Sequence, residues 1–210
     1  LAWMARILQD PGGKRPGVAV VLRGGKGVGK GTFANYFGQI FGEAYMLIST
    51  SKGFTGNFNM HLSKCLLAFL DEATWGGNRK DEGQLKSLIT EPIQLFEPKG
   101  IDSMNLENHI NVIVSSNSDW VVPASIDERR FFVLDVDDSK AQDSKYFAAL
   151  CNQMENGGVE AMMYDLLHLD YSSVNLYNAP RTEGLANQVE QGLDKTMQFW
   201  RDVLERGYLL

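Results

Sequence analysis

The chain has 210 residues, of which 44% are hydrophobic and 22% are charged, as in an ordinary globular protein with one sizeable domain. Its formal net charge of −6 argues against a surface coated with positive charge for nucleic acid, but does not exclude a local basic lining. No apolar run is long enough to span a bilayer, no signal peptide is visible, and no Cys/His spacing indicates zinc.

Apolar runs and helical periodicities alternate along the chain. The runs that predict buried strands are 18–22, 44–48, 65–70, 110–115 and 131–136. The helical patterns cover 1–9, 32–41, 81–90, 145–154, 159–169 and 185–206, with a polar loop at 49–59 and a hairpin at 93–106. This alternation predicts an α/β fold, with a central, mostly parallel five-stranded sheet flanked by helices. We expect a core over 1–169, then a linker and a C-terminal helical segment over 170–210, in a piece of a longer protein.

The most informative motif is the run GGKGVGKGT at residues 24–32, between the first strand and the following helix. Glycines let consecutive backbone N–H groups curve around a polyphosphate, and the positive end of the new helix points at the same anion. Lys30 is placed to reach the terminal phosphates. The residues expected to bind the nucleotide are Gly24, Gly27, Gly29, Lys30, Gly31 and Thr32.

One position departs from the usual phosphate loop. The residue after the lysine is normally Ser or Thr, whose hydroxyl ligates Mg²⁺, but here it is Gly31 and the threonine follows as Thr32. The GKGT ending resembles the loop of adenylate kinases. We expect Thr32 to contact a phosphate, with Mg²⁺ held mainly through water and an acidic residue.

Polar residues follow two of the predicted strands, at the sheet edge where parallel α/β proteins bind ligands. Asp71 and Glu72 follow the third run, and Asn117 follows the fourth. In a nucleotide hydrolase, Asp71 would hold Mg²⁺ and Glu72 would act as general base on the attacking water. Asn117 would orient that water or sense the γ-phosphate.

Two arginines, Arg129 and Arg130, precede the last predicted strand. Paired arginines are often surface salt-bridge partners, but an NTPase also needs a cation on the transition-state phosphates. When a neighbouring subunit supplies it, this cation is an arginine finger. The sequence does not distinguish the two arginines in this role.

The motifs GGKGVGKGT, LLAFLDEA, VIVSSN and DERRFFVLDV, in this order and with a Lys-bearing hairpin, resemble the superfamily three helicases of viruses, phages and plasmids. The resemblance is closer to the C-terminal helicase domain of phage and prophage primase-helicases, and it covers about residues 1–169. It implies an AAA+-like P-loop ATPase that uses ATP and Mg²⁺ to translocate on single-stranded DNA. The family's hairpin grips DNA inside a ring, which implies that Lys99, and less directly Lys86, contacts DNA.

The resemblance also implies partners and a location. These are single-stranded DNA, a homo-hexameric ring of the full-length protein and a primase region in the same polypeptide, in the cytoplasm of a bacterial host and without a membrane. Two alternatives stay open: a nucleoside monophosphate kinase, suggested by GKGT, and an ATP-binding clamp or loader that does not unwind DNA. DNA-stimulated ATP hydrolysis would separate the helicase from both alternatives.

Overall fold

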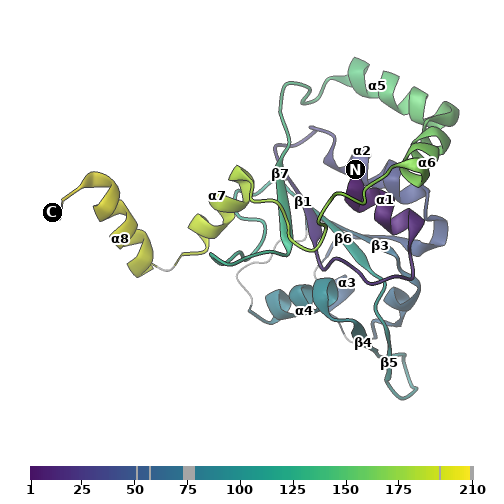
Figure 1. The fold of residues 1–210 in the computed structure, drawn as a ribbon, viewed down its shortest axis with the longest axis horizontal. Coiled ribbons are helices and arrows are strands. Elements are labelled where there is room, and N and C mark those ends of the chain that lie inside the picture. Colours follow the sequence, from purple (N-terminus) through teal and green to yellow (C-terminus); the bar gives the residue numbers. More distant parts are fainter. Residues whose placement is uncertain (51, 57, 73–78, 194, 209–210) are drawn as a thin grey trace.

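A five-stranded parallel sheet forms the centre of the computed structural model, which describes residues 1–50, 52–56, 58–72, 79–193 and 195–208 (Figure 1). Its strands are β1 (Ala19–Arg23), β2 (Tyr45–Ile48), β3 (Leu67–Asp71), β6 (Asn111–Ser116) and β7 (Phe131–Asp135). They lie in the order β2-β3-β6-β1-β7, and every pairing is parallel. The predicted α/β class and five-stranded sheet are confirmed.

The helices and the remaining strands surround this sheet. The helices are α1 (Ala2–Gln9), α2 (Lys30–Gln39), α3 (Lys52–Thr55), α4 (Arg79–Thr90), α5 (Ser144–Gln153), α6 (Val159–His168), α7 (Glu183–Gln191) and α8 (Lys195–Arg206). Strands β4 (Ile93–Phe96) and β5 (Met104–Glu107) pair antiparallel as the expected hairpin. Figure 1 shows this hairpin projecting away from the sheet.

Two local expectations were wrong. The polar loop at 49–59 contains the short helix α3. The single helix expected at 185–206 is two helices, because α7 ends where the N–H of Gly192 bonds to the carbonyls of Gln188 and Val189. Helix α7 also begins two residues earlier than expected, since the hydroxyl of Thr182 accepts the N–H of Leu185 and caps the helix.

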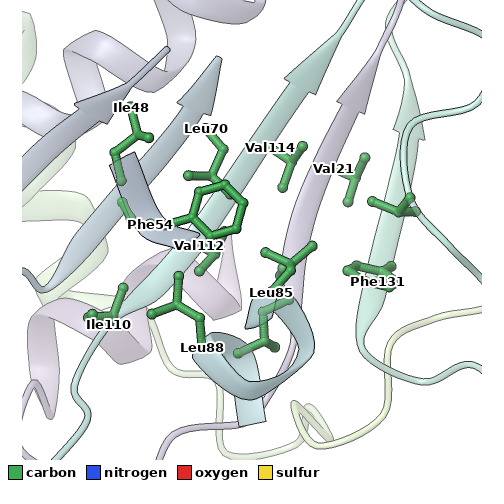
Figure 2. Close-up of a cluster of buried hydrophobic side chains, with 14 of the residues drawn as sticks. Val21, Ile48, Phe54, Leu70, Leu85, Leu88, Ile110, Val112, Val114 and Phe131 are labelled. Atoms are coloured by element: carbon green, nitrogen blue, oxygen red, sulfur yellow. The ribbon is translucent and has the colours of Figure 1, made fainter. Parts of the chain in front are cut away.

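Both faces of the sheet are buried, which explains why its strands read as continuous apolar runs. Alternate residues point to opposite faces, so Val21 and Val114 face one core while Val20 and Ile113 face the other. The first core is closed by side chains from α3, α4 and α7, and Figure 2 shows Phe54, Leu85 and Leu88 of α3 and α4 gathered over Leu70, Val112 and Val114 of the sheet. The second core is closed by α1, α2 and α6.

Helix α7 is part of this packing although it lies in the predicted C-terminal segment. Leu185 is buried in the first core, and the Thr182 hydroxyl donates to the carbonyl of Val133 in β7 at 2.6 Å. Both cysteines are free, and burial raises the pKa of Cys65 to about 12. Among the described residues, no helix combines the length and the apolar character needed to cross a membrane.

Candidate nucleotide-binding site

The glycine-rich loop connects the carboxyl end of β1, which lies between β6 and β7 in the sheet, to α2. Gly27 and Gly29 have φ values of +75° and +97°, a region that favours glycine. A Cβ on Gly29 would also lie 2.8 Å from the ring of Phe147 in α5, so this position needs glycine for space as well. Helix α2 begins at Lys30 and therefore points its free N–H groups at the space over the loop. The strand, glycine-rich loop and helix follow one another as the sequence predicts, while phosphate binding by this loop stays a prediction.

Lys30 is 8% exposed and lies at the centre of the site. Its ammonium donates to the carbonyls of Gly24 and Gly25, both at 2.7 Å, and to Oδ1 of Asn117 at 2.8 Å. Burial lowers the pKa of the Lys30 ammonium, and the carboxylates of Asp71 and Glu72 act in the opposite direction. A buried ammonium that is held by neutral acceptors is suited to meet an incoming anion.

The acidic pair lies beside this lysine. Asp71 ends β3 and accepts a hydrogen bond from the hydroxyl of Ser115 at 2.5 Å. Glu72 has a φ of +51°, which is uncommon outside glycine, and its N–H donates to the carbonyl of Ser115 at 3.0 Å. The side chain of Glu72 is exposed and accepts a hydrogen bond from Nδ2 of Asn117.

Asn117 therefore bridges the lysine and the glutamate. Its carboxamide accepts from Lys30 through Oδ1 and donates to Glu72 through Nδ2. Asn117 directly follows β6, the strand between β1 and β3. The structure thus gathers Lys30, Asp71, Glu72 and Asn117, which the sequence predicts as one constellation, at a single edge of the sheet.

Thr32 lies in the first turn of α2 and lines a cavity of about 530 Å³ beside the loop. Apolar side chains of the loop, α2, β7 and α5 form most of its walls, among them Val28, Phe33, Tyr36, Leu134, Phe147 and Leu150. The segment between β7 and α5 packs directly on the loop, since the N–H of Gln142 donates to the carbonyl of Gly27 at 3.0 Å. The cavity is next to the phosphate loop, and its size and apolar walls suit a planar heterocycle.

The residues present fit a magnesium nucleotide. Protein Mg²⁺ sites commonly use one or two carboxylates, with water and substrate phosphates completing the octahedron. Asp71 and Glu72 supply such carboxylates next to Lys30, while Gly31 offers no side chain. Among the described residues, no three His, Cys, Asp or Glu side chains cluster as a metal site. The Mg²⁺ site therefore stays a prediction.

The two arginines lie at the amino-terminal ends of the strands, opposite the ends that carry the glycine-rich loop. Both precede β7, whose first residue, Phe131, pairs with Ala19 at the start of β1. The five residues of β7 span roughly 16 Å at about 3.3 Å per residue, so neither arginine is near the phosphate loop of its own chain. The structure does not bring Arg129 and Arg130 together with Lys30.

The two arginines also differ from each other. Arg130 donates from Nη1 to both carboxylate oxygens of Glu128, at 3.1 and 3.2 Å, and the side chain of Glu128 is fully buried. Glu128 also accepts the backbone N–H groups of both arginines at 2.9 Å. Arg129 is exposed, and within the part of the chain that the structure describes its guanidinium has no hydrogen-bond or ion-pair partner.

The two lysines predicted to contact DNA also differ in their location and in their ion pairing. Lys99 is exposed in the connection between β4 and β5, next to Gly100 with a φ of +76°. Lys86 is on α4 rather than on the hairpin, and its ammonium pairs with Glu82 at 2.6 Å. Lys99 is therefore the more available cation.

Phe58 is a surface feature that the sequence does not single out on its own. It is 55% exposed and has a φ of +65°, a strained conformation for a bulky residue. The next residue, Asn59, holds the hairpin: its amide donates to the carbonyl of Leu95 at 3.0 Å and accepts the N–H of Glu97 at 2.8 Å. The exposed Phe58 thus directly precedes the residue that bonds the end of β4 from which the connection with Lys99 leaves.

Comparison with known proteins places this site in a family. A family of unknown function, DUF5906, matches residues 22–130, which run from the end of β1 through Arg130. The chain belongs to this family. The matched residues include the glycine-rich loop, the acidic pair, Asn117 and both arginines.

A protein named "DNA Primase-polymerase", from Nitratiruptor phage NrS-1, is 30% identical over 137 residues, which are 63% of this chain and 19% of that protein. Two apo structures of the C-terminal region of NrS-1 have TM-scores of 0.83 and 0.82, with 23% and 22% identity. They cover 96% and 98% of this chain, which spans 49% of each solved chain. The solved structures show a shared fold. The similarity to a phage primase-polymerase supports the expected relationship to phage replication proteins, whereas the resemblance to superfamily three helicases stays a prediction.

Proposed function

We propose that this chain is the ATP-hydrolysing motor domain of a phage or prophage replication protein, with an AAA+-like P-loop fold. The observation that carries the proposal is the continuous hydrogen-bonded connection from Lys30 through Asn117 to Glu72, over a glycine loop that opens α2. The relationship to a phage primase-polymerase supports it.

In this proposal, ATP lies with its phosphates over the loop and its base in the neighbouring cavity. The backbone of Gly24, Gly27, Gly29 and Gly31 surrounds the phosphates, and Lys30 contacts the β- and γ-phosphates. Thr32 contacts a phosphate or a water of the metal. Asp71 holds Mg²⁺, which supplies charge neutralisation on the phosphates when bound.

Glu72 acts as general base in the proposed reaction. Its exposed carboxylate can accept a proton from a water that attacks the γ-phosphate. Asn117 fixes the orientation of Glu72 and links it to Lys30, so that the base and the phosphate-binding cation keep one geometry. A carboxamide suits this role because it offers an acceptor and a donor at the same time.

We assign the arginine finger to Arg129 rather than Arg130. Arg130 is engaged by the buried carboxylate of Glu128, whereas Arg129 is exposed and free to contact another subunit. Both lie far from the phosphate loop of their own chain, so the cation would act in trans, on a neighbour's nucleotide. This supports a ring of identical subunits, which we propose to be a hexamer in the full-length protein.

The proposed DNA contact is the hairpin β4–β5. Lys99 at its connection would contact phosphates without reading bases, and Phe58, next to the Asn59 that bonds the same end of β4, would stack on an unpaired base. One such hairpin per subunit would give a ring a positive collar despite the net charge of −6. Lys86, which pairs with Glu82, would contribute less.

The proposed setting is a longer polypeptide that also carries a primase region and acts in the cytoplasm of a bacterial host. The alternatives are a nucleoside monophosphate kinase and an ATP-dependent clamp or loader. The kinase needs a second nucleotide as acceptor, whereas the clamp would bind ATP without hydrolysis that responds to DNA.

The test is phosphate release from MgATP by the purified protein, with and without single-stranded DNA. Wild type and Glu72→Gln are compared, with Lys145→Ala as an exposed surface control on α5. The proposal expects hydrolysis that DNA stimulates and that Glu72→Gln abolishes without loss of ATP binding. Phosphorylation of a nucleoside monophosphate would favour the kinase, hydrolysis indifferent to DNA would favour the clamp, and absence of MgATP binding would refute all three.

A further inference from the structure

Gln188 of α7 is fully buried, and its side chain forms hydrogen bonds with backbone groups of one distant loop. Its Oε1 accepts the N–H groups of Val121 and Val122 at 2.6 and 3.2 Å. Its Nε2 donates to the carbonyl of Asp119 at 2.6 Å. One uncharged side chain thus bonds the N–H groups of two buried residues, Val121 and Val122, together with the carbonyl of Asp119.

The loop that Gln188 holds begins at the site. It follows Asn117, whose carboxamide joins Lys30 to Glu72. The carbonyl of Asp119 also accepts from Arg23 at 3.3 Å, and Arg23 is the last residue of β1 before the phosphate loop. Asp119 is therefore held from two directions, by β1 and by α7.

We propose that Gln188 is a positioning residue for Asn117, so that α7 belongs to the working site although it lies outside the residues that define the family match. The inference rests on the proposed function for its catalytic consequence, but its structural claim is independent of that function. If the loop shifted, the carboxamide of Asn117 would lose the orientation that lets it contact an ammonium and a carboxylate together.

The amide chemistry of Gln188 is what this role requires. The loop presents two donors and one acceptor, which a carboxamide matches without introducing charge. Glutamate keeps the acceptors and, when ionised, loses the donor to Asp119. Methionine fills a similar volume and offers neither the amide acceptor nor the amide donor.

The experiment compares Gln188→Met and Gln188→Glu with Leu185→Ala, all in the 210-residue chain. Leu185 is buried on the same helix and packs in the core, so its truncation destabilises α7 without removing a hydrogen bond to the loop. Two readouts are taken well below the melting temperature of each variant. One is kcat and KM for ATP, and the other is the NMR signal of the Asn117 side-chain amide, assigned by its loss in Asn117→Ala.

We expect Gln188→Met to lower kcat about tenfold with KM changed less than about twofold, and to move the Asn117 amide signal. Gln188→Glu should move that signal in the same direction by less. Leu185→Ala should leave the signal and kcat near wild type. An unmoved Asn117 signal in Gln188→Met, or equal shifts in Leu185→Ala, would overturn the positioning role.

The two proposals fail separately. If the wild-type protein does not bind MgATP, or does not hydrolyse it at any protein concentration, the proposed function is refuted, while the Asn117 signal still decides whether Gln188 positions that side chain. If hydrolysis is present but the signal is indifferent to Gln188, the function stands and the positioning role is rejected.

Discussion

Removing the carboxamide of Asn117 is the most direct test of the site. Asn117→Ala deletes the acceptor for Lys30 and the donor to Glu72 in one step. Lys30 keeps the carbonyls of Gly24 and Gly25 as partners, so its place in the loop should survive. Glu72 loses the hydrogen-bond partner that orients its carboxylate, and the effect should therefore fall on catalysis rather than on binding.

The magnitude follows from the bond that Glu72 loses. A hydrogen bond to a charged group contributes about 1.5–3 kcal/mol, and a loss of about 2 kcal/mol from the transition state lowers the rate roughly 30-fold. We expect kcat of Asn117→Ala to fall by about this factor, while the dissociation constant for MgATP changes by less than about threefold.

The assay is steady-state phosphate release together with calorimetric titration of MgATP. Ser118→Ala is the matched control, because Ser118 is the exposed next residue and its backbone N–H keeps the bond to Ser116. A kcat equal to wild type would show that Asn117 does not orient the base. A loss of MgATP affinity with an unchanged kcat would mean that its contribution is uniform binding, and the reasoning would be wrong.

The remaining predictions concern the cations of the chain and the proposed base. Lys30→Ala should abolish hydrolysis and weaken nucleotide binding, whereas Glu72→Gln should bind ATP and not hydrolyse it; the same titration and turnover assays separate the two. Arg129→Ala should bind ATP normally, hydrolyse it poorly, and regain activity when mixed with Lys30→Ala in an assembling full-length protein; mixed rings without recovery would contradict a trans role. Arg130→Ala should instead lower the free energy of unfolding by about 1–3 kcal/mol, measured by urea denaturation, because buried Glu128 loses its ion pair. Lys99→Ala should weaken single-stranded DNA binding and reduce its salt slope by about one, measured by fluorescence anisotropy, and an unchanged slope would make it a plain surface lysine.

The sheet and the central constellation could be predicted from the sequence for one physical reason. Strands buried on both faces must be apolar throughout. Each strand, and the polar residues that directly follow it, can therefore be recognised in the sequence without knowledge of the fold. Parallel strands then bring their carboxyl ends to one edge, which places Asp71, Glu72 and Asn117 beside Lys30 before any coordinates are known.

The parts that escaped prediction depend on contacts between distant residues. The burial of Glu128, which separates Arg130 from Arg129, is not visible in the local pattern DERR. The same holds for Asn59, whose amide reaches the hairpin 36 residues away, and for Gln188, which reaches Val121 67 residues away. Side-chain to backbone bonds of this kind leave no periodicity in the sequence.

The position of the arginines has a consequence for the whole assembly. Because β1 and β7 run parallel and in register, the residues before β7 and the loop after β1 are separated by the full length of these strands. The exposed Arg129 lies at the amino-terminal ends of the strands, and the proposed phosphate-binding loop lies at their carboxyl ends. This placement matches a head-to-tail arrangement, in which each subunit would supply its arginine to the nucleotide of the next. Such contacts close into rings when the rotation permits. For the proposed motor, one chain would then hold every part of a working site except the finger, and its hydrolysis rate would rise with protein concentration.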